Sequence, residues 1–185
     1  MTKLLLVIDM QEDFFQQGRL AKKRTEFTCS LNKLIHAFRR ESQKIIWVRQ
    51  VFKEDLSDTY LALRQSSQQS TIEGTSGSEL LGELVRYPKE YEVIKKRYSA
   101  FFETELDEIL NEMAPSEIVI AGVNTHACVR VTAIDAYQRD YHLILAKECI
   151  DSYDQSCHDE SFGYMVNSGI GVPLSNTEII DRLKS

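Results

Sequence analysis

The sequence has few of the features that mark secreted or metal-stabilised proteins. Only four of its 185 residues are cysteines, and no two of them form a C-x-x-C pair. Disulfide frameworks and structural zinc sites usually show denser or more regular cysteine spacing. We therefore expect free thiols, as in a reducing compartment, and a cytoplasmic protein.

Long apolar runs and a basic charge excess are also missing. The aliphatic run at residues 4–8 is too short for the core of a signal peptide, and no later run approaches a membrane span. The formal net charge is -6, and lysine and arginine are not clustered. That balance disfavours a nucleic-acid surface. We expect a small-molecule substrate as the partner, with no nucleic acid and no membrane.

What the sequence does contain is a regular alternation of strand-like and helix-like segments. Its length and 43% apolar content fit a single domain over residues 1–185. Aliphatic runs and helical stripes alternate along it, which predicts a three-layer α/β fold: a mostly parallel, Rossmann-like sheet with helices on both faces. A polar stretch at 54–78 is expected to be a long excursion or a partly helical loop. The strands are expected at 4–8, 44–52, 91–95, 117–123 and 142–146, and the helices at 26–40, 103–113 and 127–139.

Three chemically active residues fall near the carboxyl ends of predicted strands. Asp9 follows the first strand, Lys95 ends the third, and Cys128 follows the turn after the fourth. Ligands bind at that edge of open α/β sheets. If Thr125 is the N-cap of the next helix, the helix dipole and Lys95 would lower the pKa of the Cys128 thiol and raise its thiolate fraction roughly tenfold. Backbone N–H groups of the same turn could form an oxyanion hole.

Three blocks of the sequence resemble the isochorismatase-like hydrolases, a superfamily that includes nicotinamidases and N-carbamoylsarcosine amidases. The similarity follows the family's order over most of the chain, and it implies the isochorismatase-like hydrolase fold. The blocks are Leu6-Val7-Ile8-Asp9-Met10-Gln11, Val93-Ile94-Lys95-Lys96-Arg97-Tyr98-Ser99-Ala100-Phe101 and Gly122-Val123-Asn124-Thr125-His126-Ala127-Cys128-Val129.

The resemblance implies a catalytic triad. In it, Cys128 attacks a carbonyl carbon, Asp9 relays protons, and Lys95 stabilises the charged thiolate and carboxylate. The resemblance also implies a cis peptide bond before Asn124, with the backbone N–H groups of Asn124 and Cys128 forming the oxyanion hole. Strand alternation turns only one of the neighbouring lysines toward the site. The family's lysine stands four residues before the Ser-Ala-Phe block, which selects Lys95 over Lys96.

The same resemblance narrows the reaction. True isochorismatases carry glycine where Cys128 stands, so the thiol favours acyl transfer at an amide-like C–N bond. Nicotinamidases carry an Asp-x-His metal motif, but here no histidine occurs between His36 and His126. We therefore expect no metal and no other cofactor. The predicted function is a cysteine amidase for small amide, carbamoyl or ureido compounds, acting through a thioacyl-enzyme. A vinyl-ether hydrolase of the isochorismatase type and a nicotinamidase are the alternatives.

Candidates for substrate contact are Gln11, Phe14 and Tyr98. Family habit favours a homo-oligomer, to which the excursion at 54–78 would contribute by reaching a neighbouring subunit.

Other readings remain open. A lone cysteine is more often a buried apolar residue than a nucleophile. Taken singly, Asp9 could be a turn residue after a strand and Lys95 a solvated surface charge. It is their shared location at strand ends that favours catalysis. A histidine base is disfavoured because His126 lies two positions from Cys128 and would project from another helix face. Two non-enzymatic alternatives are a redox thiol protein, with Cys149 or Cys157 as the resolving thiol, and an inactive binding module.

Overall fold

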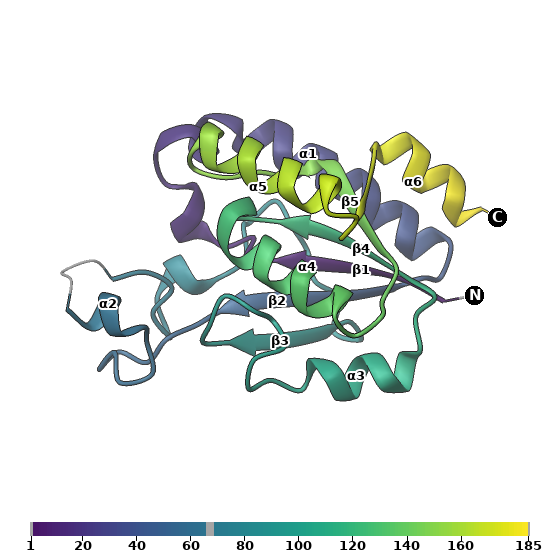
Figure 1. The fold of residues 1–185 in the computed structure, drawn as a ribbon. Helices are drawn as coiled ribbons and strands as arrows, with labels where there is room; N and C mark the ends of the chain where they lie inside the picture. Colours follow the sequence, from purple (N-terminus) through teal and green to yellow (C-terminus); the bar gives the residue numbers. More distant parts are fainter. Residues whose placement is uncertain (1, 66–68, 185) are drawn as a thin grey trace.

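A parallel sheet forms the centre of the molecule. In the computed structural model, which describes residues 2–65 and 69–184, this sheet has six strands in the order β3-β2-β1-β4-β5-β6 (Figure 1). All neighbouring strands pair in parallel, which confirms the predicted fold class. The strands are β1 (Lys3–Ile8), β2 (Lys44–Gln50), β3 (Tyr91–Lys95), β4 (Glu117–Gly122), β5 (Leu143–Ile150) and β6 (Val172–Leu174).

Helices cover both faces of this sheet. Leu5 and Val7 of β1 pack beneath α1 (Gly18–Arg40) and α6 (Asn176–Leu183). The alternate β1 residues pack in the cluster that also holds side chains of α3 (Leu106–Met113), α4 (Arg130–Tyr137) and α5 (Gln155–Asn167). A central parallel strand buried on both faces needs apolar residues throughout, which explains the unbroken aliphatic run. No helix among the described residues combines the length and the apolar character that crossing a membrane requires.

Several boundaries differ from those expected. Helix α1 begins at Gly18 rather than at residue 26. The sequence pattern missed its first turns because they are largely polar and carry no clear apolar stripe. The helix expected at 127–139 begins with a π-helical turn, η3 (Thr125–Val129), before α4. Thr125 is not the N-cap. Asn124 takes that position, without a side-chain capping bond. The carboxyl-terminal tail, for which no helix or strand was predicted, forms α5, β6 and α6.

The polar excursion lies between β2 and β3 and projects past the carboxyl ends of these strands (Figure 1). It contains the short helices α2 (Leu61–Arg64) and η2 (Ser76–Ser78), in line with a partly helical excursion; its residues 66–68 lie outside the described part. Isolated bridges join Phe52 to Ile72 and Gln11 to Leu80. The last part of the excursion is therefore bridged to the segments that follow β1 and β2.

The carboxyl ends of β1 and β4 lie side by side where the strand order reverses, which is the usual ligand position in such sheets. Gly122 ends β4 there with a φ of 129°. A Cβ atom at this position would lie 2.0 Å from the carbonyl oxygen of Ile8. Only glycine allows the two strand ends to approach this closely.

We expect Gly122→Ala to lower the free energy of unfolding by about 3 kcal/mol or more, because the new methyl group meets backbone that cannot move aside. Gly163→Ala is the matched control. It lies within α5 with open space around its Cα, so alanine should raise stability by about 0.5–1 kcal/mol. Chemical denaturation of both variants measures the difference, and equal stabilities would contradict the assigned role of Gly122.

Candidate active site

Asp9, Lys95 and Cys128 meet in the interior at the carboxyl edge of the sheet. The Lys95 ammonium nitrogen Nζ lies 2.8 Å from Asp9 Oδ2 and 3.2 Å from Cys128 Sγ. Asp9 and Lys95 are fully buried, and Cys128 is 4% exposed. Asp9 directly follows β1, Lys95 ends β3 and Cys128 lies in η3, so the strand ends set their spacing. The sequence-predicted triad residues are therefore in contact, with the lysine between the thiol and the carboxylate.

The strand register selects Lys95 over its neighbour. Val93 and Lys95 are both buried in β3, whereas Lys96 follows the strand and is partly exposed. Lys96 forms an ion pair with Asp58 at 2.9 Å and donates to the carbonyl oxygen of Val51. Lys95 therefore belongs to the buried cluster, whereas Lys96 binds Asp58 of the excursion.

Burial shapes the charge state of the lysine. Desolvation by itself would lower the pKa of Lys95, but the adjacent Asp9 carboxylate and the hydrogen bond to Cys128 Sγ outweigh it, and the net pKa is raised. Lys95 is therefore an ammonium ion at neutral pH. A fully buried cation of this kind is tolerated only beside an anion that it contacts directly.

The thiol behaves differently from the sequence-based expectation. Burial raises the pKa of the Cys128 thiol, the Asp9 carboxylate raises it further, and the opposing effect of Lys95 is smaller. The expected lowering by a helix N-terminus was wrong, because the site excludes the water that would solvate a thiolate. At neutral pH Cys128 is a protonated thiol, so a reaction at Sγ requires a base, and Asp9 is the neighbouring carboxylate.

The turn between β4 and α4 carries the nucleophile candidate. The peptide bond between Val123 and Asn124 is cis. The carbonyl oxygen of Asn124 accepts hydrogen bonds from the N–H groups of Ala127 and Val129, at 3.1 and 3.2 Å. The Asn124 and Cys128 N–H groups, which the resemblance assigns to an oxyanion hole, belong to this same turn.

The side chain of Gln11, a predicted substrate contact, is engaged by backbone groups of two other segments. Its side chain is fully buried, and its Nε2 donates to the carbonyl oxygens of Gln50 and Ser78 at 2.8 and 2.7 Å. Its Oε1 accepts from the Gln50 N–H at 2.9 Å. These backbone bonds occupy the carboxamide and join β2 to the end of the excursion.

The predicted aromatic contacts separate into two groups. Phe14 packs against the core beneath α1, on the other face of the sheet from the cluster that contains Cys128, so it does not join the thiol. Tyr98 is 47% exposed and lies against Tyr60, with 4.8 Å between ring centroids. Burial raises the pKa of Tyr60, and so do the nearby Cys128, Tyr98 and Asp9. Tyr60 and Tyr98 are therefore the aromatic pair beside the triad.

Tyr60 is the site residue that sequence reasoning missed. It precedes α2 in the polar excursion, where no pattern marks it as close to the sheet edge. Its hydroxyl group lies 3.3 Å from Gln50 Oε1, and the Arg97 guanidinium lies 5.4 Å from its ring centroid. The only sequence signal was a tyrosine isolated in a Ser- and Gln-rich stretch.

The remaining histidines and cysteines do not join the triad. His126 Nδ1 lies 2.7 Å from Ser152 Oγ, and His158 Nδ1 lies 2.7 Å from Thr125 Oγ1. Cys149 is buried and donates to Asn176 Oδ1 at 3.4 Å. All four thiols are free. Within residues 2–65 and 69–184, no three histidine, cysteine, aspartate or glutamate side chains lie together in a way that could hold a metal ion.

The fold and the motif order both point to one family, whose isochorismatase domain model matches residues 3–178. The chain belongs to the isochorismatase family. A probable inactive nicotinamidase of Arabidopsis thaliana is 29% identical over 177 residues, covering 91% of this chain and 90% of that protein. This isochorismatase-family chain is therefore a hydrolase by family, and its relatives include both named amidases and a probable inactive one.

Solved structures agree with the family assignment. An isochorismatase family protein from Desulfovibrio vulgaris superposes with a TM-score of 0.89 at 25% identity, over 100% of this chain and 99% of that one. The N-carbamoylsarcosine amidase from Thermoplasma acidophilum superposes with a TM-score of 0.80 at 26% identity, over 95% and 97% of the two chains. Both cover nearly the whole isochorismatase-family fold described above.

The raised pKa of Cys128 predicts that its thiol reacts slowly near neutral pH. In the free protein near neutral pH, iodoacetamide should modify the exposed Cys29 before the buried Cys128. Since the Cys128 pKa is raised, its labelling should accelerate only above the ordinary range of thiols. Peptide mapping by mass spectrometry over time follows both sites. Faster labelling of Cys128 than of Cys29 near neutral pH would contradict the direction of the shift.

Proposed function

We propose that the protein is a cysteine amidase that hydrolyses a C–N bond of a small amide, carbamoyl or ureido compound. The observation that carries the proposal is the contact of the Lys95 ammonium with both Asp9 and Cys128 in a buried site. A buried charge cluster around a thiol has a high desolvation cost, and such arrangements concentrate at functional sites. By the resemblance described above, Cys128 also stands where true isochorismatases carry glycine, which favours a thiol mechanism.

In the first half of the reaction, Asp9 takes the proton from the Cys128 thiol as Sγ attacks the carbonyl carbon of the substrate. Negative charge develops on the carbonyl oxygen, where the backbone N–H groups of Asn124 and Cys128 would receive it. Asp9 then returns the proton to the leaving nitrogen, and the C–N bond breaks. The products of this half are a free amine or ammonia and a thioester on Cys128.

In the second half, water replaces the amine. Asp9 accepts a proton from the water as its oxygen attacks the thioester carbon, and the C–S bond breaks when the tetrahedral intermediate collapses. The acid product leaves, and the proton held by Asp9 returns to Sγ. Lys95 remains an ammonium throughout, which is consistent with its raised pKa, and it stabilises the charge as this moves between carboxylate and sulfur.

The aromatic pair Tyr60 and Tyr98 supports a small, planar or carbonyl-bearing substrate. Tyr98 is partly exposed, and Tyr60 lies close enough to the triad for Cys128 and Asp9 to affect its pKa. The two rings contact each other, with 4.8 Å between their centroids, and an aromatic pair of this kind suits the flat face of an amide or ureido group.

A panel of small amides, carbamoyl and ureido compounds, with ammonia release as the readout, tests the proposed activity. Wild-type protein should release ammonia from at least one compound, at the same rate after exhaustive chelation. Cys128→Ala should reduce the rate to background, because the nucleophile is removed. Hydrolysis that survives in Cys128→Ala would exclude the thioacyl route. A rate that falls on chelation and returns with zinc, iron or manganese would favour a metal-assisted nicotinamidase.

The two neighbouring lysines give a matched pair of variants. We expect Lys95→Met to lower kcat/KM about 100- to 1000-fold, because the positive charge between the thiol and the carboxylate is lost. Lys96→Met removes the ion pair with Asp58 and should cost only a few-fold. Circular dichroism establishes that both variants are folded. The reverse order of effects would refute the role given to Lys95.

A further inference from the structure

The segment that follows β5 holds the turn that carries Cys128. The Asp151 N–H donates to the carbonyl oxygen of Gly122 at 3.3 Å, and the Asp151 carbonyl oxygen accepts from the Thr125 N–H at 3.0 Å. The Tyr153 N–H donates to Asn124 Oδ1 at 3.1 Å. Residues 151–153 therefore contact the turn on both sides of the Val123–Asn124 bond. We call residues 122–128 the nucleophile turn.

Side chains strengthen the same connection. Ser152 Oγ lies 2.7 Å from His126 Nδ1 and 3.5 Å from Asn124 Oδ1. Thr125 Oγ1 lies 2.7 Å from Nδ1 of His158, which comes from α5. The residues between Asn124 and Cys128 are thus held from outside the turn, through groups that do not touch Asp9 or Lys95.

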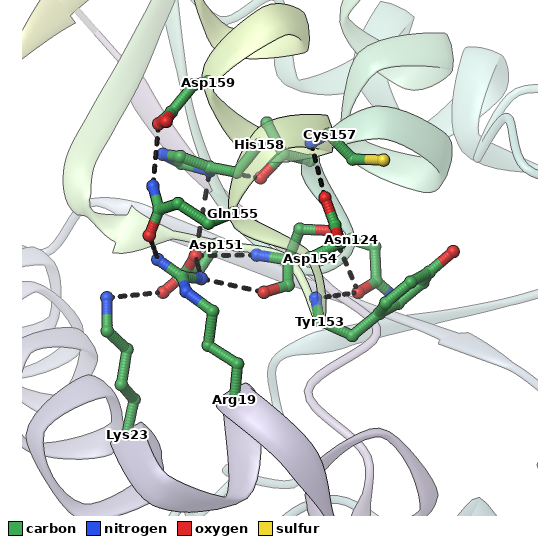
Figure 2. Close-up of polar contacts among 12 residues, drawn as sticks. Arg19, Lys23, Asn124, Asp151, Tyr153, Asp154, Gln155, Cys157, His158 and Asp159 are labelled. Atoms are coloured by element: carbon green, nitrogen blue, oxygen red, sulfur yellow. Dashed lines mark hydrogen bonds and ion pairs between the residues drawn. The ribbon is translucent and has the colours of Figure 1, made fainter.

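The position of residues 151–153 depends in turn on a buried carboxylate. Asp151 is 5% exposed, and its Oδ1 accepts from the Ser152 N–H at 2.8 Å and from Arg19. Its Oδ2 lies 3.1 Å from Lys23 Nζ. Arg19 also donates to the Ser152 carbonyl oxygen at 2.8 Å and to Gln155 Oε1. Figure 2 shows Arg19 and Lys23 reaching from α1 to Asp151, with His158 and Gln155 on the far side.

Burial by itself would raise the pKa of Asp151, but Arg19, the Ser152 N–H and Lys23 outweigh it, and the pKa is lowered. The carboxylate is therefore charged at neutral pH and depends on Arg19 for its compensation. Helix α1 covers one face of the sheet, while α4, which follows the nucleophile turn, covers the other. The Arg19–Asp151 pair joins the first turn of α1 to the segment that holds the nucleophile turn.

We propose that Arg19 and Asp151 are positioning residues for the proposed amidase: their ion pair fixes residues 151–153, and through them the backbone N–H groups and the sulfur of the nucleophile turn. The inference rests on the proposed function for its catalytic part. Neither Arg19 nor Asp151 needs to touch the substrate, because the ion pair acts through Thr125 and Asn124.

A second ion pair on the same helix supplies the control. Arg39 and Glu90 have side-chain exposures of 14% and 7%, against 19% and 7% for Arg19 and Asp151. Glu90 also accepts from Trp47 Nε1 and from the Tyr87 N–H, so its carboxylate is equally well occupied. This pair lies at the opposite end of α1, away from the carboxyl edge of the sheet. Its loss should reduce stability without moving the nucleophile turn.

Hydrogen exchange by mass spectrometry, with Arg19→Met and Arg39→Met compared at a temperature where both are folded, tests the structural part. Arg19→Met should speed exchange of the Thr125, Ala127 and Val129 amides, and Arg39→Met should leave these amides at the wild-type rate. Equal exchange in the two variants would overturn the proposal. This readout needs no substrate, so a failure of the amidase proposal leaves it intact and is detected separately by the wild-type ammonia panel.

The catalytic part uses a compound that the wild-type protein hydrolyses. Arg19→Met should lower kcat on the order of 10- to 100-fold with KM changed little, because displaced N–H donors weaken transition-state binding more than substrate binding. Arg19→Lys should recover part of kcat. Arg19→Met/Asp151→Asn should be no worse than Arg19→Met, since the two residues act as one unit. Unchanged kcat in Arg19→Met, or an equal loss in Arg39→Met, would overturn the positioning role.

Discussion

The contact of one buried ammonium with a carboxylate and a thiol sets the conditions for the rest of the structure. Lys95 and Asp9 have no exposed surface, so each depends on the other to offset the cost of leaving water. That dependence requires β1 and β3 to keep their register around β2, and it requires the turn after β4 to close against the end of β1. Gly122 allows the ends of β1 and β4 to approach each other, and the aliphatic strands hold the sheet in this arrangement. The sheet is thus the support that holds three polar groups in an apolar interior.

Much of this architecture could be predicted because the relevant signals are local. The aliphatic run at residues 4–8 predicts a strand buried on both faces. Strand alternation turns only one of the two lysines at 95 and 96 toward the interior. The carboxyl-terminal end of α1 was also predicted correctly, from the apolar stripe of the helix. Its beginning was not, because the first turns carry Arg19 and Lys23, whose partner Asp151 is distant in sequence.

What the sequence could not supply was the environment of each polar group. Gln11 belongs to the quoted motif, yet its carboxamide is occupied by backbone from two other segments. The direction of the Cys128 pKa depends on burial and on Asp9, neither of which a helix N-terminus reveals. Tyr60 comes from the excursion and contacts Tyr98 just beyond the end of β3, a contact that no residue pattern in the excursion indicates. Each of these outcomes is a consequence of long-range packing, which residue patterns do not record.

The central place of β1 also bears on how the molecule is made. Strand β1 precedes both of its neighbours, β2 and β4, in the chain, so it has only one hydrogen-bonded neighbour until residues 117–122 have been made. Parallel pairing over such a separation closes late, because the loop entropy must be met before the contacts form. We expect Asp9, which follows β1, to stay hydrated until β4 pairs with β1. The triad can close only after Cys128, which follows β4 in the chain, has reached the edge of the sheet beside Asp9 and Lys95.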